Sequence, residues 1–439
     1  MKSLHLRMRL LFVFQLLVVV ATAQTKPPLD AIASDPVKMG WMVGSPPPAE
    51  RQIRFSEGGH RRFPESRWAF SHQREFVPTV LIARGQGPAT ILPRTERADI
   101  DALEFFPIGS KEPMTWSQSL LQNYTDAIVV LHGGRVVYER YFGVQASERP
   151  HAVFSVTKSF VGILAAAMVV EGTLDESAIV SRYLPELQDS AFGSATVRQL
   201  MDMTTGVRFD ENYAKPDAEI WDFNRAGNLL PRPAGYTGPD SFYSYLKTLK
   251  NEADHGSRFA YRTPTSNALG WILHRITGKP FAQLMHDRIW SKIGMEQDAY
   301  CTIDSIGTEH TGGGLNATLR DLSRFGEMIR LRGKYNGQQV IPTEAVDLIA
   351  RGGSKELFAK AGYATKPGWS YRSMWWVSHN EHGAFDARGI HGQVIYIDPT
   401  AEMVIVRFAS HPLGSSTHND PTSLPAYHAL AKHLMRMTK

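Results

Sequence analysis

The sequence is poor in cysteine. Its 439 residues include a single one, Cys301, so no disulfide can form within the chain. A chain of this length can bury a large core without such cross-links. We therefore expect Cys301 to be a small buried hydrophobic residue and not a catalytic thiol.

The excess of positive over negative charge is also small. The formal net charge is +5, and three of the basic residues (Lys2, Arg7 and Arg9) lie in the first 23 residues, which contain no acid, leaving about +2. A charge this small and dispersed gives no basic groove for a nucleic acid. Beyond the first 23 residues, no segment is long and apolar enough to span a bilayer.

The first 23 residues have the order of a secretory signal peptide. A basic start precedes the apolar run Leu10–Val20, and Ala21-Thr22-Ala23 offers a small-x-small cleavage site before Gln24. The apolar run is short for a membrane helix, although an uncleaved N-terminal anchor stays open as an alternative. The sequence predicts a periplasmic or secreted protein with a signal peptide over residues 1–23.

Several catalytic and cofactor motifs are absent. There is no G-x-S-x-G, no H-E-x-x-H and no cysteine pair, which argues against an α/β-hydrolase and against a zinc site. We interpret His379–His382 as a surface turn. Gly312-Gly313-Gly314 is not followed by Lys-Ser/Thr, so it is read as a turn before a helix and not as a phosphate loop. We expect no cofactor and no metal.

The chain divides into segments of different character. Residues 24–115 are rich in Pro, Arg and Gly, and we expect an N-terminal extension of loop or extended chain packed on the main domain. Ala127–Leu131 and Arg135–Phe142 flank His132-Gly133-Gly134 in the pattern of a β-hairpin. Ser155–Glu171 is apolar nearly all round, which predicts a helix buried on most sides.

The rest of the chain predicts the fold class. Residues 176–345 alternate short helical patterns with Gly/Pro loops, and the C-terminal part contains β-prone runs at 373–377, 384–390, 393–397 and 403–409 before a helix at Pro425–Met437. We predict an α+β fold, with an antiparallel sheet flanked by helices (116–175 and 346–439) and an inserted, mostly helical domain (176–345).

Ser155-Val156-Thr157-Lys158 has the spacing S-x-x-K. Positions i and i+3 share a helix face, so the Lys158 amine can reach the Ser155 hydroxyl, and burial would leave that amine able to take a proton. Ser244 and Lys247 have the same spacing, but they lie in a polar stretch where Lys247 would stay solvated. The sequence therefore favours Ser155 as the nucleophile.

Two further segments could complete a site. Tyr261 offers a phenol that would ionise more easily beside a cationic lysine and could act as base and then as acid. The strand Ala387–Ile390 leads into His391-Gly392-Gln393, where a strand-edge N–H facing that of Ser155 would form an oxyanion hole, and glycines there let a substrate approach the backbone.

These elements, in this order, resemble the serine β-lactamase and penicillin-binding superfamily, with its S-x-x-K, Tyr and K-T-G motifs. The resemblance covers residues 120–435 and is strongest to class C enzymes and their relatives of the 6-aminohexanoate-dimer-hydrolase and esterase type. It is carried by Phe154–Phe160, Leu200–Gly206, Thr311–Leu315 before Arg320-Asp321-Leu322, and Gly389–Gln393.

The resemblance implies roles for individual residues. Ser155 would be the nucleophile, Lys158 its proton partner and Tyr261 the general acid/base, with the N–H groups of Ser155 and Ile390 as the oxyanion hole. Tyr213 matches a tyrosine on a mobile loop that closes over the substrate. An ordinary loop tyrosine is the alternative.

Two departures from the motifs bear on the substrate. The class C triplet Y-x-N reads Tyr261-Arg262-Thr263 here, and the lysine of K-T-G is replaced by Ala387, or by His391 in the other register. Arg388 or His391 could still supply positive charge next to Gly389. Both changes favour an esterase or linear-amide hydrolase over a β-lactamase.

The sequence thus predicts an exported serine hydrolase that cleaves a small amide or ester through an acyl-enzyme. One alternative is a D,D-carboxypeptidase or β-lactamase, and another is a catalytically silent binding protein on the same scaffold. The oligomeric state stays open.

Overall fold

The structure, a computed structural model, describes residues 27–436. The predicted signal peptide therefore lies outside the described residues. The largest sheet has seven antiparallel strands in the order β11-β12-β13-β14-β15-β4-β5. Its strands come from two distant parts of the sequence: β4 (Thr125–His132) and β5 (Arg135–Tyr141); and β11 (Ser370–Arg372), β12 (Trp375–Val377), β13 (Phe385–Gly389), β14 (Gln393–Asp398) and β15 (Met403–Ala409).

The predicted hairpin is confirmed. Strands β4 and β5 pair with His132 opposite Arg135, and the two residues between them, Gly133 and Gly134, have φ angles of 55° and 74°. Positive φ at both central positions defines the tight turn whose twist matches that of the flanking strands, and glycine adopts it without steric cost.

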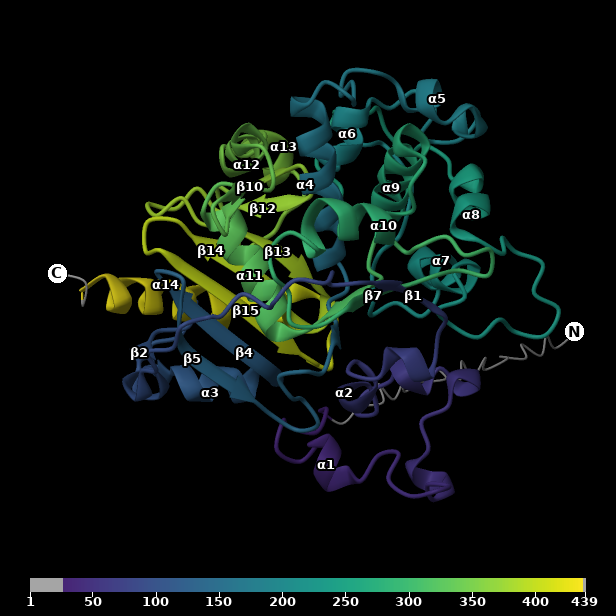
Figure 1. The fold of residues 1–439 in the computed structure, drawn as a ribbon. Coiled ribbons are helices and arrows are strands. Elements are labelled where there is room, and N and C mark those ends of the chain that lie inside the picture. Colours follow the sequence, from purple (N-terminus) through teal and green to yellow (C-terminus); the bar gives the residue numbers. More distant parts are fainter. Residues whose placement is uncertain (1–26, 437–439) are drawn as a thin grey trace, which may run out of the picture.

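Helices cover both faces of the sheet, because apolar side chains of β4 alternate between two cores. Ile128 and Val130 belong to the core under α14 (Asp420–Arg436) and α3 (Trp116–Gln122), whereas Val129 and Leu131 belong to the core that contains α4 (Val156–Val170) and α11 (Leu319–Arg330). Figure 1 shows α14 and α3 on one side of the sheet and α4 on the other. The architecture is the predicted antiparallel sheet flanked by helices.

Helix α4 is the centre of the molecule. It lies between the sheet and α9 (Figure 1), and it is buried from Val156 to Met168. Its Gly162 packs against the turn between β11 and β12, where an added Cβ would lie 1.9 Å from the carbonyl oxygen of Ser373. The predicted buried helix is therefore confirmed.

The remaining elements surround α4 and the active-site side of the sheet. The helices are α5 (Val180–Tyr183), α6 (Val197–Met201), α7 (Glu219–Ala226), α8 (Phe242–Thr248), α9 (Thr263–Thr277), α10 (Phe281–Met285), α12 (Thr343–Ala350) and α13 (Lys355–Ala359). A second sheet has the order β1-β7-β8-β6 and consists of β1 (Thr79–Ile82), β6 (His151–Ala152), β7 (Ala299–Thr302) and β8 (Leu315–Ala317). Two short pairs are β2 (Glu104–Phe105) with β3 (Met114–Thr115), and β9 (Lys334–Tyr335) with β10 (Gln338–Gln339).

The N-terminal segment contains more structure than loop or extended chain. It forms α1 (Pro36–Met39), α2 (Ser66–Ala69), several 3₁₀ turns and strand β1, which pairs with β7. It also reaches the core: the Phe70 ring contacts that of Phe154 with centroids 4.8 Å apart. This segment therefore forms part of the wall next to Ser155.

Two predicted element boundaries were wrong. The last helix begins at Asp420 and not at Pro425, so Pro425 lies inside the helix. Proline has no N–H, so it cannot donate to the carbonyl of Pro421 one turn earlier. That carbonyl accepts a hydrogen bond from the N–H of Ile108 instead (2.8 Å). The run predicted to start at Ser373 begins at Trp375, since Ser373 and Met374 have φ angles of 47° and 66° and form a tight turn.

Cys301 is fully buried in β7, as predicted. Across residues 27–436, no helix combines the length and the apolar character that crossing a membrane requires.

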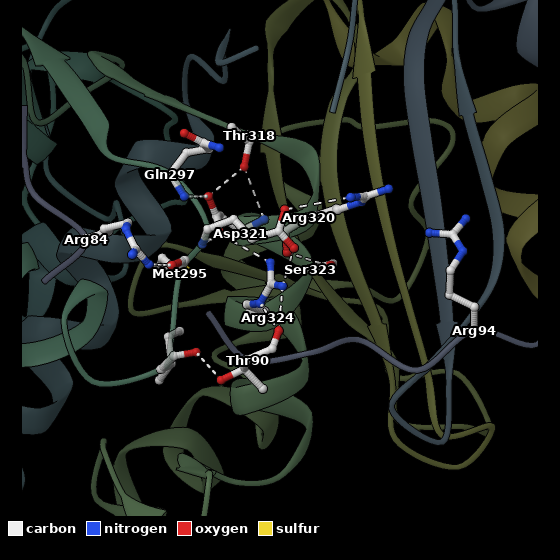
Figure 2. Close-up of polar contacts among 12 residues, drawn as sticks. Arg84, Thr90, Arg94, Met295, Gln297, Thr318, Arg320, Asp321, Ser323 and Arg324 are labelled. Carbon is white, nitrogen blue, oxygen red and sulfur yellow. Dashed lines mark hydrogen bonds and ion pairs between the residues drawn. The ribbon is translucent and has the colours of Figure 1, made fainter. Parts of the chain in front are cut away.

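A buried ion pair fastens α11 to two neighbouring loops (Figure 2). Asp321 accepts hydrogen bonds from the N–H groups of Glu296 (2.7 Å) and Gln297 (3.0 Å) and lies 3.3 Å from Arg324. Arg324 in turn donates to the carbonyl of Thr90. Asp321 therefore has a structural function, holding the loops on either side of α11.

Candidate active site

Ser155 lies at the start of α4, on a sharply bent backbone. The preceding residue, Phe154, has φ = 46°, a conformation that is strained for a bulky residue and that persists only when the surroundings impose it. The hydroxyl of Thr157 donates to the carbonyl of Phe154 (2.6 Å) and accepts from the N–H of Leu315 (3.0 Å), which fixes the bend. Ser155 is 7% exposed and lines a large cavity.

Lys158 reaches Ser155 as the spacing predicted. Its Nζ lies 2.8 Å from Ser155 Oγ, 3.0 Å from Thr263 Oγ1 and 2.5 Å from the carbonyl oxygen of Gly312. The side chain is fully buried, and burial lowers the pKa of its amine to about 8, although the carboxylate of Glu211 acts in the opposite direction. An appreciable fraction of Lys158 is therefore neutral near neutral pH.

A carboxylate connects to Lys158 through Thr263. Glu211 accepts a hydrogen bond from the Thr263 hydroxyl (2.6 Å) and another from the Thr263 N–H (2.6 Å). Because the hydroxyl has one proton and gives it to Glu211, its lone pairs face the Lys158 amine. The result is a continuous chain of hydrogen bonds from Glu211 through Thr263 and Lys158 to Ser155.

Tyr261 lies beside both catalytic candidates. Its ring centroid is 5.1 Å from Lys158 Nζ, and it stacks on Trp376 with centroids 5.5 Å apart. The expectation that its phenol ionises easily was wrong: burial and the Glu211 carboxylate raise the pKa of Tyr261 well above its usual value, and a hydrogen bond with Ser155 only partly opposes them. The phenol is therefore a proton donor at neutral pH.

Tyr213 borders the same cavity, which has a volume of about 1140 Å³. Its hydroxyl donates to Glu211 (3.0 Å), its ring contacts Trp221 edge-on, and Gly414 packs against it. The cavity is at the upper end of the range for small-molecule sites. Tyr213 thus lies where a side chain could cover a bound substrate.

Gly389 and Ile390 also line the cavity, opposite the start of α4. A Cβ on Gly389 would lie 2.4 Å from the carbonyl oxygen of Val153, so only glycine allows β13 to approach the segment before Ser155 this closely. Among residues 27–436, the N–H groups of Ser155 and Ile390 donate no hydrogen bond to another residue. Two unused donors from residues that line the same cavity fit the predicted oxyanion hole.

Neither of the two residues that were expected to supply positive charge, Arg388 and His391, provides it in a free form. Arg388 lines the cavity, but its guanidinium is paired with the buried carboxylates of Asp386 (2.7 Å) and Asp420 (2.5 Å). His391 donates its backbone N–H to Gly414, and burial lowers its side-chain pKa to about 4, so its imidazole is neutral. Its side chain is also not among those lining the cavity. The predicted substrate-binding function of His391 is thus not supported by its position.

The competing serine and lysine pair does not form a site. Ser241 and Ser244 form the cap at the start of α8, where the backbone N–H of each donates to the hydroxyl oxygen of the other. Lys247 is exposed. Lys247 is therefore solvated, as the sequence predicted.

Sequence reasoning missed Glu211 altogether and gave no function to Thr263 or Gly312. Thr263 occupies the third position of the triplet Tyr261-Arg262-Thr263, and Gly312 lies in the motif Thr311–Leu315, so both positions carried a signal. For Glu211 there was none, because it precedes Thr263 by 52 residues and meets it only in the folded chain.

Comparison with known proteins shows the family of the chain. A family model described as Beta-lactamase matches residues 118–424. The chain is 33% identical, over 356 residues, to 6-aminohexanoate-dimer hydrolase of Paenarthrobacter ureafaciens, and the match covers 81% of this chain and 88% of that protein.

Solved structures give the same result. The structure titled "Putative 6-aminohexanoate-dimer hydrolase from Bacillus anthracis" superimposes with a TM-score of 0.81 at 35% identity and covers 89% of this chain and 99% of its own. EstCE1, a hydrolase with promiscuous acyltransferase activity, has the same fold with a TM-score of 0.56 at 15% identity, covering 72% and 96% of the two chains.

Proposed function

Because the chain belongs to the Beta-lactamase family and is a serine hydrolase similar to 6-aminohexanoate-dimer hydrolase, we propose that it cleaves a linear amide or ester through an acyl-enzyme on Ser155. The observation that carries the proposal is the 2.8 Å contact between Lys158 Nζ and Ser155 Oγ at the floor of the cavity. A hydroxyl that gives its proton to a neighbouring amine becomes a competent nucleophile.

The first half of the reaction forms the acyl-enzyme. Ser155 Oγ attacks the substrate carbonyl carbon while its proton passes to neutral Lys158, and the carbonyl oxygen takes up negative charge between the N–H groups of Ser155 and Ile390. The carbon–nitrogen or carbon–oxygen bond then breaks, and the leaving group takes a proton from Tyr261. Lys158 returns its proton to Tyr261, so no net proton is lost.

The second half releases the acid. Water attacks the acyl carbon, its proton passes to the same amine and phenol pair, and the bond to Ser155 Oγ breaks with return of a proton to Ser155. Tyr213 would cover the substrate during both steps. No step in this sequence requires a metal or an organic cofactor.

The charge distribution supports a linear substrate over a β-lactam or a cell-wall peptide. A lysine at the K-T-G position would hold the carboxylate of such substrates, but here Ala387 is buried and the adjacent Arg388 is neutralised by two carboxylates. The Arg388 guanidinium is therefore not free to bind an anionic group of the substrate.

Export is part of the proposal. The basic residues, the apolar run Leu10–Val20 and the Ala21-Thr22-Ala23 site support a cleaved signal peptide and a periplasmic or secreted enzyme. N-terminal sequencing of protein recovered from the periplasm or medium tests this, with Gln24 expected as the first residue. Recovery only of chains that begin at Met1 would contradict it.

A substrate panel tests the activity. Hydrolysis of the linear 6-aminohexanoate dimer, p-nitrophenyl butyrate and nitrocefin would be compared under identical conditions, with Ser155→Ala as the inactive variant and Ser244→Ala as the matched control. We expect turnover of the dimer or the ester, little with nitrocefin, complete loss in Ser155→Ala and no change in Ser244→Ala.

Two results would overturn the proposal. Preferred hydrolysis of nitrocefin would favour the β-lactamase alternative. Failure of a fluorophosphonate probe to label Ser155 in folded protein would favour the silent binding protein.

A further inference from the structure

A group of metal-ligating side chains lies away from the active site, at the turn between β12 and β13. The turn supplies Glu381 and His382, and helix α14 supplies His428. One ligand atom from each of the three lies within 4.8 Å of the others. Donor atoms on a single zinc ion are roughly 3.3 Å apart, given metal–ligand distances of about 2.0–2.1 Å, so small rotamer changes would bring all three onto one ion.

The tautomer of His382 suits a metal ligand. Its Nδ1 lies 2.8 Å from Asp398 Oδ2 and donates to that oxygen, so in the neutral ring the lone pair available to a metal is on Nε2. The side chain is 7% exposed, which holds this orientation. A carboxylate behind a histidine is the common second partner of a metal-bound imidazole.

The other two ligands complete the set. His428 Nε2 lies 3.2 Å from Glu381 Oε1, and the rings of His428 and His382 are 5.2 Å apart between centroids. The ligand atoms of His428 and Glu381 therefore already have about the spacing of two donor atoms on one zinc ion.

The surrounding charges favour a cation. Glu381 and Asp398 bring two negative charges, against one positive charge from Lys432, whose Nζ lies 3.9 Å from Glu381 Oε1. The turn is held in shape independently: Asn380 Oδ1 accepts from the N–H of Ala384, and Thr400 Oγ1 donates to the carbonyl of His382. The backbone that carries Glu381 and His382 is therefore held in place.

Contrary to the expectation from the sequence that the chain holds no metal, we propose that Glu381, His382 and His428 form a binding site for a divalent transition-metal ion, with zinc as the preferred metal. Two imidazoles and one carboxylate suit zinc, and they leave a fourth position for water. The ion would tie α14 to the β12–β13 turn. It is separate from the reaction, because this turn precedes β13 while Gly389, which lines the active-site cavity, ends it.

Zinc titration by calorimetry tests the proposal. The protein would be purified without a histidine tag and stripped of metal with a chelator. We expect one zinc ion per chain. His382→Ala and His428→Ala should each weaken binding by roughly tenfold or more, and Asp398→Asn by about 10- to 100-fold. His433→Ala, on the same helix but paired with Asp99, is the matched control and should bind zinc normally.

A measurement on the unmodified protein guards against variants that misfold. Cobalt(II) bound to two imidazoles and a carboxylate in tetrahedral geometry gives intense visible absorption, and zinc should displace it stoichiometrically. Absence of saturable zinc binding, or binding unchanged in both His382→Ala and His428→Ala with circular dichroism of the native fold, would overturn the site.

Discussion

Glu211 and Thr263 meet through two hydrogen bonds of 2.6 Å each, from the backbone N–H and from the hydroxyl of Thr263. This pairing places a carboxylate one side chain away from Lys158, whose Nζ contacts the same hydroxyl at 3.0 Å. A threonine thus stands at the sequence position where the Y-x-N motif has an amide, and a carboxylate is hydrogen-bonded to it. The negative charge of Glu211 raises the pKa of both Lys158 and Tyr261.

The first prediction concerns this charge. Glu211→Gln keeps an acceptor for Thr263 but removes the negative charge that raises the pKa of Lys158. We expect the acidic limb of the kcat/KM profile to move to lower pH, by roughly one unit for each 1.4 kcal/mol of lost interaction. Glu252→Gln, at the same cavity but paired with Arg258, is the control and should leave the limb unchanged. A limb that stays in place in Glu211→Gln would show that the carboxylate does not act on the amine.

The second prediction is the pH dependence of the unmodified enzyme. If neutral Lys158 takes the Ser155 proton, activity should rise with pH as the amine loses its own proton, with an apparent pKa near 8. The pKa of this buried amine is depressed, so its neutral fraction grows between pH 6 and pH 9. Initial rates on an ester whose leaving group needs no protonation give this limb directly. A profile that is flat over this range would contradict Lys158 as the base.

The third prediction distinguishes the function of the Tyr261 phenol from that of the Lys158 amine. Tyr261→Phe removes the proton donor for the leaving group, and an alkylamine leaves only when protonated, whereas p-nitrophenolate leaves without help. We expect amide hydrolysis to fall by about 10²–10⁴-fold and p-nitrophenyl ester hydrolysis by much less. Tyr243→Phe, a buried tyrosine stacked on Trp271, controls for loss of a hydroxyl. Equal losses on both substrates would argue that Tyr261 acts mainly by positioning.

The fourth prediction concerns stability. Asp321→Ala leaves the buried guanidinium of Arg324 without one of its carboxylate partners and removes the acceptor for two loop N–H groups (Figure 2). We expect a loss of about 3–5 kcal/mol in the free energy of unfolding, measured by urea denaturation. Asp347→Ala breaks the exposed pair with Arg332 and should cost less than about 1 kcal/mol. Similar costs for the two variants would show that the cluster contributes little.

Local pattern was sufficient for much of the fold. The glycine pair between β4 and β5 predicted the hairpin, and the apolar run after Ser155 predicted α4. Both predictions succeeded because turn geometry and helix period depend on residues that are neighbours in the sequence. Pro425 misled the prediction of the last helix, since the partner that compensates for it, Ile108, is remote in sequence. The contact between Ser155 and Lys158 was predictable for the same local reason.

The sequence by itself predicted the contact between Ser155 and Lys158 and the apolar helix that buries both, since residues three positions apart share a helix face. Only the tertiary structure decided the protonation of Tyr261, the neutralisation of Arg388 by Asp420 and the meeting of Glu211 with Thr263. Charge and proton affinity depend on burial and on groups brought together from distant segments, and no local spacing encodes either.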